Sequence, residues 1–293
     1  MPDPIAAALT QAIGVNVIEG SAEPVGGGSI HQSLRYRTKH GSIFVKVGSI
    51  ATAAMFEAEA VGLKALSDAE AIRVPTVLAL GEYSDRSFLC LEWLDLTSTS
   101  EVAEEKFGSQ LAALHRSQAQ AYGAHPDNFI GRTPQSNRST SNWPDFFREQ
   151  RLLPQLERAR HNGADSTTLH RGAQLAESLD AFFIDYQPAA SLLHGDLWGG
   201  NWGATREGAP AIFDPAVYYG DREADIAMTR LFGGFGRAFY AAYEAAWPLD
   251  VGATEREVLY NLYHVLNHFN LFGGGYLAQA RQMIERALAE VKM

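Results

Sequence analysis

The sequence changes character near residue 94, and this change limits the possible folds more than any other feature. Up to that point, short β-branched or alternating runs predict about five strands, at residues 15–18, 34–38, 43–47, 77–80 and 88–93. Residues 52–66 have the spacing of a helix. Beyond residue 100, helical patterns dominate. The pattern predicts an α+β fold, with a small antiparallel β-rich lobe that contains one helix and a larger, mainly helical lobe.

The length supports the same division. The chain has 293 residues, enough for about two domains or lobes. We expect an N-terminal lobe over residues 1–93, a Thr/Ser-rich hinge over residues 94–100 and a C-terminal lobe over residues 101–293. Residues 122–145 are rich in Gly, Pro, Asn and Ser, which predicts a long ordered loop.

Composition excludes several classes of function. Lys and Arg number 24 against 34 Asp and Glu, and the net charge of −10 disfavours binding to nucleic acid or to an anionic membrane. The one cysteine, Cys90, excludes an internal disulfide and a cysteine-based zinc site. No apolar run approaches ~18 residues and no basic residue precedes Arg35, so we expect no membrane span and no secretory signal, and infer a cytoplasmic protein. The sequence predicts no particular oligomeric state.

The densest group of chemically active residue types lies at residues 192–214. An apolar run leads into His194 and Asp196, and Asn201 follows Asp196 with four residues between them. Asp214 comes thirteen residues after Asn201, at the end of another apolar run. An aspartate in such a loop can accept a proton from an attacking hydroxyl, while an amide oxygen and a carboxylate suit Mg²⁺. We therefore predict Asp196 as the catalytic base and Asn201 and Asp214 as metal ligands.

The order of these residues matches the catalytic loop of kinases, in which His-x-Asp-x₄-Asn precedes a metal-binding aspartate. The alternative is that Asp196 and Asn201 are turn residues whose side chains bond their own backbone. That alternative explains each residue alone but explains the ordered set poorly.

A glycine-rich turn lies between the first two predicted strands. Gly27, Gly28 and Ser29 belong to it, and the backbone N–H groups of such a turn could approach a triphosphate. A purely structural hairpin turn is the alternative.

A lysine and a glutamate in the N-terminal part also fit a nucleotide site. Lys46 lies inside the third predicted strand, and Glu59 follows thirteen residues later in the predicted helix. In kinases such a pair orients the lysine toward the nucleotide phosphates. An ordinary edge-strand lysine is the alternative. Glu57 could also be the partner, but Glu59 shares a helical face with Leu63, so we expect Glu57 to be solvated.

The strand at residues 88–93 leads into the predicted hinge. Backbone groups of Glu92 and Leu94 could hydrogen-bond the edge of an adenine, although a plain buried strand fits this segment equally well. His264 and His268 stand four apart in a helical pattern, but no third metal ligand follows, so we interpret them as ordinary histidines.

Two longer motifs resemble those of a known family. They read HGDLWGGN at residues 194–201 and DPAVYYGDREAD at residues 214–225. Both are similar to the motifs of the fructosamine/ketosamine-3-kinases, within the aminoglycoside and choline phosphotransferase branch of kinase-like folds. Shorter matches, among them DNFIGRTPQ at residues 127–135, extend the resemblance over nearly the whole chain.

The resemblance implies a bilobal protein-kinase-like fold and an ATP- and Mg²⁺-dependent small-molecule kinase. Its acceptor would be the 3-hydroxyl of a ketosamine, either free or protein-bound, such as a fructosamine, ribulosamine or erythrulosamine adduct, and its action would lead to deglycation. By position, Asp196 resembles the catalytic base of the family, Asn201 and Asp214 its Mg²⁺ ligands, and Lys46 and Glu59 its nucleotide-phosphate pair.

The resemblance also implies supporting and substrate-binding roles. Asp225 would hold the catalytic loop by accepting backbone N–H bonds, with His194 as further structural support. Trp198, Asp127 and Asn128 would contact the sugar.

Two other functions remain open at this point. The chain could be an aminoglycoside- or choline-type phosphotransferase, which the DREAD segment at residues 221–225 disfavours. It could also be a non-catalytic nucleotide-binding module, which the presence of Lys46, Asp196, Asn201 and Asp214 disfavours.

Overall fold

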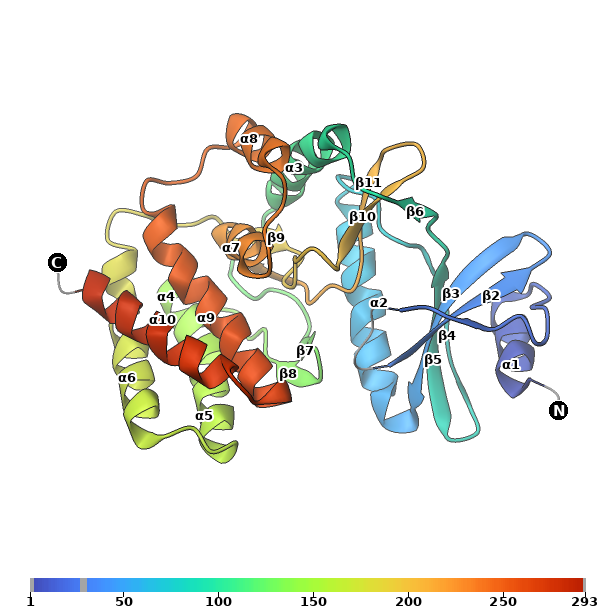
Figure 1. The fold of residues 1–293 in the computed structure, drawn as a ribbon, viewed down its shortest axis with the longest axis horizontal. Coiled ribbons are helices and arrows are strands. Elements are labelled where there is room, and N and C mark those ends of the chain that lie inside the picture. The colour runs from blue at the N-terminus through green and yellow to red at the C-terminus, as the bar shows by residue number, and fades with distance from the viewer. Residues whose placement is uncertain (1–2, 27–30, 292–293) are drawn as a thin grey trace.

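The computed structural model describes residues 3–26 and 31–291. A five-stranded antiparallel sheet forms one end of the molecule, and helices fill most of the other end (Figure 1). This arrangement confirms the predicted α+β class, with a β-rich N-terminal part and a mainly helical C-terminal part. The exact limits of the two lobes stay a prediction.

The sheet has the order β1-β2-β3-β5-β4, and all neighbouring strands in it run antiparallel. Its strands are β1 (Glu23–Pro24), β2 (Gln32–Thr38), β3 (Gly41–Ser49), β4 (Val77–Tyr83) and β5 (Arg86–Glu92).

Two helices, α1 (Pro4–Ile13) and α2 (Ala53–Asp68), cover opposite faces of this sheet. Leu9 of α1 packs in a cluster with Cys90 of β5, whereas Leu63 of α2 packs in another cluster with Leu89 and Leu91. Because side chains alternate along a strand, β5 buries residues against both helices.

The prediction of a single helix in this part is wrong, since α1 is a second one. The Asp3 side chain caps its start by accepting the N–H groups of Ile5 (3.2 Å) and Ala6 (3.3 Å), and Gly14, at φ +68°, ends it. An N-cap aspartate before a proline and a glycine at the end are standard helix signals. They outweigh the short β-branched run that follows them.

The predicted strand at residues 15–18 is also wrong. Only Val17 pairs there, in an isolated bridge to Thr38. The first strand of the sheet is instead β1, whose Pro24 suits an edge position because proline has no N–H to donate.

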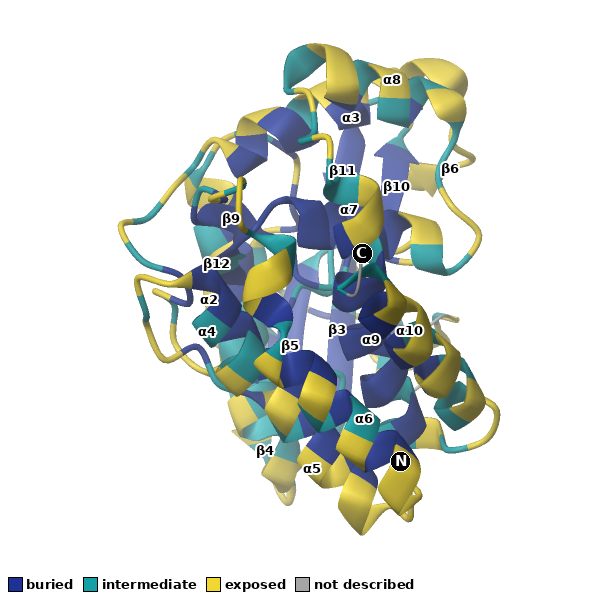
Figure 2. Cartoon of the chain, turned by 90° about the vertical axis from the view of Figure 1, so that its left-hand side faces the viewer, coloured by how far each residue is buried: buried dark blue, intermediate teal, exposed yellow. Residues whose placement is uncertain are grey.

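Helices dominate the C-terminal part, as predicted. The helices are α3 (Glu101–His115), α4 (Trp143–Phe147), α5 (Leu153–His161), α6 (Ser166–Glu177), α7 (Glu223–Leu231), α8 (Arg237–Ala246), α9 (Ala253–Phe272) and α10 (Tyr276–Glu290). A π-helical turn (Arg148–Leu152) joins α4 to α5. Two 3₁₀ turns lie at Ile50–Thr52 and Leu179–Phe182. Most of α9 is buried, whereas the outer faces of α5, α8 and α10 are exposed (Figure 2).

Seven short strands complete the fold of the described residues. They are β6 (Leu96–Thr97), β7 (Asn128–Ile130), β8 (Thr133–Gln135), β9 (Ser191–Leu193), β10 (Trp202–Thr205), β11 (Pro210–Ile212) and β12 (Tyr218–Gly220). β6 lies in the predicted hinge and pairs with β10, so this part of the hinge is ordered as a strand. β7 and β8 form a hairpin within the predicted long loop.

The helix α2 lies between the sheet and the helical part (Figure 1). Its Phe56 and Leu63 belong to one buried cluster with Phe107 and Leu111 of α3 and with Ile212 of β11. A core shared in this way fixes β3 and α2 relative to the loops after β9 and β11. Among the helices of the described residues, none combines the length and the hydropathy that a membrane span requires.

Candidate active site

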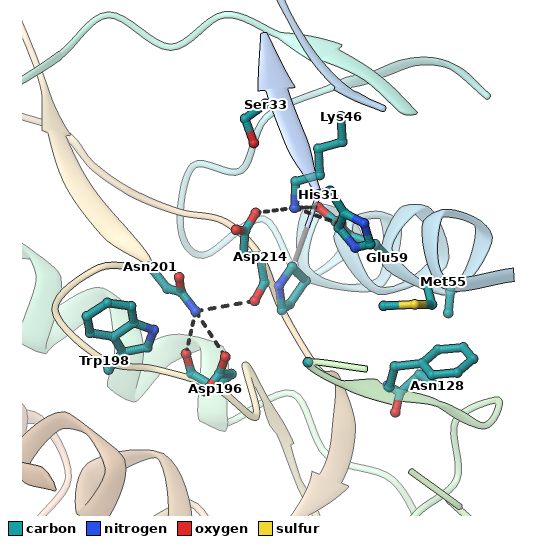
Figure 3. Close-up of a pocket in the computed structure, with 14 residues that line it drawn as sticks. His31, Ser33, Lys46, Met55, Glu59, Asn128, Asp196, Trp198, Asn201 and Asp214 are labelled. Atoms are coloured by element: carbon teal, nitrogen blue, oxygen red, sulfur yellow. Dashed lines mark hydrogen bonds and ion pairs between the residues drawn. The ribbon is translucent and has the colours of Figure 1, made fainter. Parts of the chain in front are cut away.

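The predicted base, metal ligands and nucleotide-phosphate pair meet in one cleft, which β3, α2 and the loops after β9 and β11 line. They are Lys46, Glu59, Asp196, Asn201 and Asp214. Figure 3 shows their side chains turned toward one another, with Lys46 and Glu59 on one side and the other three on the opposite side.

Asp225 of α7 fixes the loop that carries Asp196. Its carboxylate accepts the backbone N–H groups of His194 (2.7 Å) and Gly195 (2.9 Å), and it bonds Nε2 of His115 (3.2 Å). Burial alone would raise the pKa of Asp225, but the hydrogen bond from His115 and the neighbouring N–H groups hold it below its usual value. His115 bonds the Tyr243 hydroxyl with its other nitrogen (2.8 Å).

The backbone at Gly195 admits only glycine. Its φ is +81°, and a Cβ there would lie 2.1 Å from the carbonyl oxygen of Ala216. We expect Gly195→Ala to lower the free energy of unfolding by about 2 kcal/mol or more, because strained backbone and a clash act together. Urea unfolding would measure the change. Gly199→Ala is the control, since a Cβ at Gly199 meets nothing within 4 Å. Equal stability of the two variants would contradict this reading of the loop.

His194 connects the segment before Asp196 with the segment before Asp214. Its Nδ1 accepts the N–H of Asp196 (3.2 Å), so the proton of the neutral ring lies on Nε2, which donates to the carbonyl of Phe213 (3.0 Å). Burial lowers the pKa of His194, which keeps the ring neutral. The two loops of the site are therefore held in register by one imidazole.

Asp196 and Asn201 are in direct contact. The amide nitrogen of Asn201 donates to the backbone oxygen of Asp196 (2.8 Å), to its Oδ2 (3.3 Å) and to the backbone oxygen of Asp214 (3.4 Å). The carboxamide oxygen of Asn201 points away from these acceptors (Figure 3). Burial raises the pKa of Asp196 to about 7, and the nearby charge of Asp214 adds to the rise. A carboxylate with this pKa can act as a base near neutral pH.

The raised pKa of Asp196 makes stability depend on pH. The unfolded-state pKa is ~3.9, so the folded state binds this proton more tightly and loses stability as pH rises from about 4 to about 7. Asp196→Asn removes that loss. Without nucleotide or divalent metal, we expect the variant to melt about 2–4 °C higher than the wild type at pH 8 and to lose the advantage near pH 4. Calorimetric scans at both pH values would test this, and equal melting temperatures at pH 8 would contradict it.

Lys46 bridges two carboxylates from different parts of the chain. Its Nζ lies 2.7 Å from Oε1 of Glu59 and 2.6 Å from Oδ1 of Asp214, which is 168 residues away in sequence. Burial alone would lower the pKa of Lys46, but Asp214 and Glu59 raise it above its usual value, so the ammonium stays charged. Glu57 is exposed, as expected.

The side-chain oxygens of Asn201 and Asp214 could hold a divalent cation. Asp214 has φ +58°, a left-handed conformation that Asp tolerates better than most residues. Within the described part of the chain, no three His, Cys, Asp or Glu side chains gather to hold a metal ion. Mg²⁺ commonly takes one or two protein oxygens and completes its shell with water and substrate phosphates. Two oxygen donors therefore fit Mg²⁺ bound together with a nucleotide.

A second cavity, of about 270 Å³, adjoins the first and shares Ser33, Asn201 and Asp214 with it. Glu92 and Leu94 line it, together with apolar side chains of β3 and β5. The backbone N–H of Glu92 already donates to Thr76 (2.9 Å), and its carboxylate bonds Arg73 and Thr76. The Leu94 carbonyl accepts the N–H of Leu96 (3.0 Å), so the Glu92 carbonyl and the Leu94 N–H stay the candidates for a ligand contact.

Part of the predicted glycine-rich site cannot be placed. Gly27, Gly28 and Ser29 lie outside the described residues. Gly26, just before them, lines the second cavity.

The predicted sugar-contacting residues do not all reach the cleft. Trp198 and Asn128 line it, but Asp127 does not. The Asp127 carboxylate instead accepts the N–H of Asn137 (2.7 Å). The Asn128 amide donates to the carbonyl of Val217 (2.6 Å) and accepts from Gln135 (2.8 Å), so its polar atoms serve the protein. Both residues stabilise the loop, because Asp and Asn satisfy turns as readily as ligands.

Some lining residues were not predicted, among them His31, Met55 and Pro215. Burial and the charge of Lys46 lower the pKa of His31 to about 4, so its ring is neutral. Pro215 lies in the motif at residues 214–225, where no separate role is predicted for it, and only the fold brings His31 and Met55 to the cleft.

The remaining candidates are structural. Nδ1 of His268 bonds the backbone oxygen of His264 (2.8 Å), an ordinary helical contact. Burial raises the pKa of Cys90 to about 12, which keeps the thiol protonated and unreactive.

Comparison with known sequences supports the resemblance that the motifs indicate. The family model described as fructosamine kinase matches residues 1–290. A probable ketoamine kinase of Synechocystis sp. is 42% identical over 285 residues, which cover 97% of this chain and 96% of the relative. A chloroplastic protein-ribulosamine 3-kinase of Arabidopsis thaliana is 40% identical over 271 residues, which cover 92% of this chain and 82% of the relative.

Solved structures show the same similarity. A Haemophilus somnus protein named as a fructosamine-3-kinase superposes with a TM-score of 0.89 at 29% identity, over 97% of both chains. A thermostable mutant of the aminoglycoside phosphotransferase APH(4)-Ia, in a ternary complex with AMP-PNP and hygromycin B, superposes with a TM-score of 0.66 at 18% identity, over 99% of this chain and 98% of the other. The second match shows a shared protein-kinase-like fold.

Proposed function

The chain belongs to the fructosamine kinase family, and we propose that it transfers the γ-phosphoryl group of ATP to the 3-hydroxyl of a ketosamine. The use of ATP follows from the kinase family. The ketosamine acceptor rests on the names of relatives at about 40% identity. The acceptor is a sugar joined to an amine through an Amadori linkage, either free or on a protein lysine.

One observation carries the proposal for the site. The Lys46 ammonium lies 2.6 Å from the Asp214 carboxylate, and the backbone oxygen of Asp214 lies 3.4 Å from the amide of Asn201, which also contacts Asp196. Direct contacts thus join four groups in one chain of neighbours: a cation that can bind phosphate, two residues with oxygen donors for a metal, and a base. Phosphoryl transfer needs this set, because its loose transition state gains mainly from positioning and charge stabilisation.

Asp196 is the residue that receives the proton in this scheme. Its carboxylate orients the sugar 3-hydroxyl toward the γ-phosphate and takes the hydroxyl proton as the new P–O bond forms. The pKa of about 7 favours the deprotonated form above neutral pH. The N–H bonds from His194 and Gly195 to Asp225 hold the loop in place during transfer.

The other residues bind the nucleotide. Lys46, oriented by Glu59, contacts the phosphates, and Mg²⁺ held by Asn201 and Asp214 would neutralise part of their charge. The adjoining cavity takes the adenine, with the Glu92 carbonyl and the Leu94 N–H at its edge. Trp198 offers an aromatic wall to the acceptor.

The product explains the biological outcome. A phosphate on C3 lies β to C1. Once C1 loses a proton and the C2 carbonyl becomes a 1,2-enol, C3 can release inorganic phosphate, which leaves far more readily than hydroxide. The adduct then decomposes and returns the free amine, so the reaction repairs glycated amines.

The proposal is tested by acceptor-dependent release of ADP with ribulose-lysine, kanamycin and choline in parallel. We expect release with the ketosamine and none above background with the other two. Faster turnover of kanamycin or choline would instead assign the site to the alternative phosphotransferases. ATP binding without transfer to any acceptor would indicate a non-catalytic module.

A further inference from the structure

Arg151, in the π-helical turn between α4 and α5, is a buried cation without an anionic partner. Its side chain has no solvent exposure, and no carboxylate of the described residues forms an ion pair with it. Burying an unpaired charge is costly, and a protein retains one only where other groups compensate. Here the faces of Phe146 and Tyr218 lie 4.7 and 4.0 Å from the guanidinium carbon.

Two hydrogen bonds of Arg151 go to the segment directly after β8, and a third goes from Nη1 to the backbone oxygen of the neighbouring Gln150 (2.9 Å). Nη1 donates to the backbone oxygen of Ser136 (2.6 Å), and Nη2 donates to Oδ1 of Asn137 (2.7 Å). The planar guanidinium serves both acceptors at once, which a lysine ammonium cannot do with the same geometry.

Asn137, which Arg151 holds, bonds the segment before β7 and the residue before β12. Its amide donates to the carbonyl of Pro126 (2.8 Å) and, more weakly, to that of Val217 (3.4 Å). Asn128, at the start of β7, donates to the same Val217 carbonyl (2.6 Å). The hairpin is thus fastened at residues 126, 128 and 137.

The segment to which the hairpin is fastened also carries the reaction centre. Val217 is three residues after Asp214, and the N–H of Ala216 donates to the carbonyl of His194 (2.8 Å). Gln135 of β8 donates to the carbonyl of Ala216 (3.2 Å). The hairpin contributes Asn128, Phe129 and Gly131 to the cleft wall.

We propose that Arg151 is a positioning residue for the acceptor: it sets the place of the β7–β8 hairpin relative to Asp196 and Asp214. This inference rests on the proposed function, because it assigns the hairpin side of the cleft to the acceptor. Arg151 touches neither the nucleotide-binding residues nor the reacting groups. Its loss therefore loosens the acceptor wall and leaves the nucleotide side intact.

Steady-state kinetics of Arg151→Met and Arg151→Lys test the inference with ribulose-lysine and ATP. Both variants should raise the KM for the ketosamine at least tenfold and change the KM for ATP less than twofold. Lysine keeps the positive charge but cannot donate to Ser136 and Asn137 with the geometry of a guanidinium. The Arg151→Lys variant should therefore not restore the wild-type KM for the ketosamine. Arg148→Met is the matched control, because Arg148 lies on the same turn but donates to the carbonyl of Ala176 and to Asp145 and Asp180.

Asn137→Ala provides the second test, which remains decisive if the Arg151 variants fail to fold. It keeps the guanidinium and removes the link to Pro126 and Val217, so the same selective rise in the ketosamine KM is expected. Equal changes in both KM values, or a lower melting temperature with both KM values unchanged, would overturn the inference.

Hydrogen exchange separates this inference from the proposed function. In the enzyme without ligands, the amides of residues 126–137 should exchange at least tenfold faster in Asn137→Ala than in the wild type, while those of residues 194–201 keep their rates. Unchanged exchange of residues 126–137 would refute the anchor even if ketosamines are substrates. Absence of ketosamine turnover in the wild type would refute the proposed function without affecting the exchange result.

Discussion

Asp196→Asn should reduce kcat for ketosamine phosphorylation by about 10²–10⁴-fold, the usual contribution of a positioned general base. The amide cannot take the hydroxyl proton, but it fills the same space. Since Lys46 and Asp214 are unchanged, the dissociation constant for ATP should stay within about threefold of the wild type. Single-turnover kinetics and calorimetric titration with ATP would measure the two quantities.

A matched control is Asp68→Asn, on the exposed face of α2, where the carboxylate pairs with Lys64. Its turnover should equal that of the wild type. If Asp196→Asn retained near-normal turnover, the base would be misassigned. If ATP binding fell as much as turnover, Asp196 would serve the nucleotide and not the acceptor.

Lys46→Met should lower kcat/KM for ATP by about 10²-fold or more. The variant loses the cation that faces the phosphates and leaves Glu59 and Asp214 close together without it. Because breaking a buried ion pair leaves uncompensated charge, unfolding free energy should also fall by about 3–5 kcal/mol. Activity assays and urea unfolding would measure both effects.

The double variant Lys46→Met with Glu59→Gln separates activity from stability. Removing the Glu59 charge should restore much of the lost stability, but not the activity. Lys64→Met, at an exposed pair on α2, is the control and should change neither quantity noticeably. Recovery of activity along with stability in the double variant would mean that Lys46 acts only as a structural cation.

The central residues could be predicted because their chemistry restricts both type and spacing. Asp196 and Asn201 stand in one short loop, and Asp214 ends an apolar run that forms β11. Lys46 is different, because the hydrophobic periodicity of the sequence cannot show that it contacts Asp214, 168 positions away. Only the kinase motif predicted that they belong to one site.

Other parts of the fold could not be predicted for identifiable reasons. Strands such as β6 and β7 have two or three residues, too few for any alternation to be seen. Helix α1 was missed although its capping residues are present, because a short β-branched run follows directly.

Residues that support the site were the hardest to predict. His115 lies in an ordinary helical pattern, and only the fold brings it to Asp225. Asp127 belongs to a motif of the family, yet its carboxylate caps the backbone of Asn137. A motif identifies a residue as required, but it does not distinguish ligand binding from loop support.

The position of the transferred phosphate tests the central claim most directly. Phosphorus–proton correlation NMR of the product from ribulose-lysine and ATP should show coupling between phosphorus and the proton on C3, followed by release of free lysine as the adduct decomposes. Coupling to a proton on another carbon, or a stable phosphorylated adduct that releases no amine, would contradict the account.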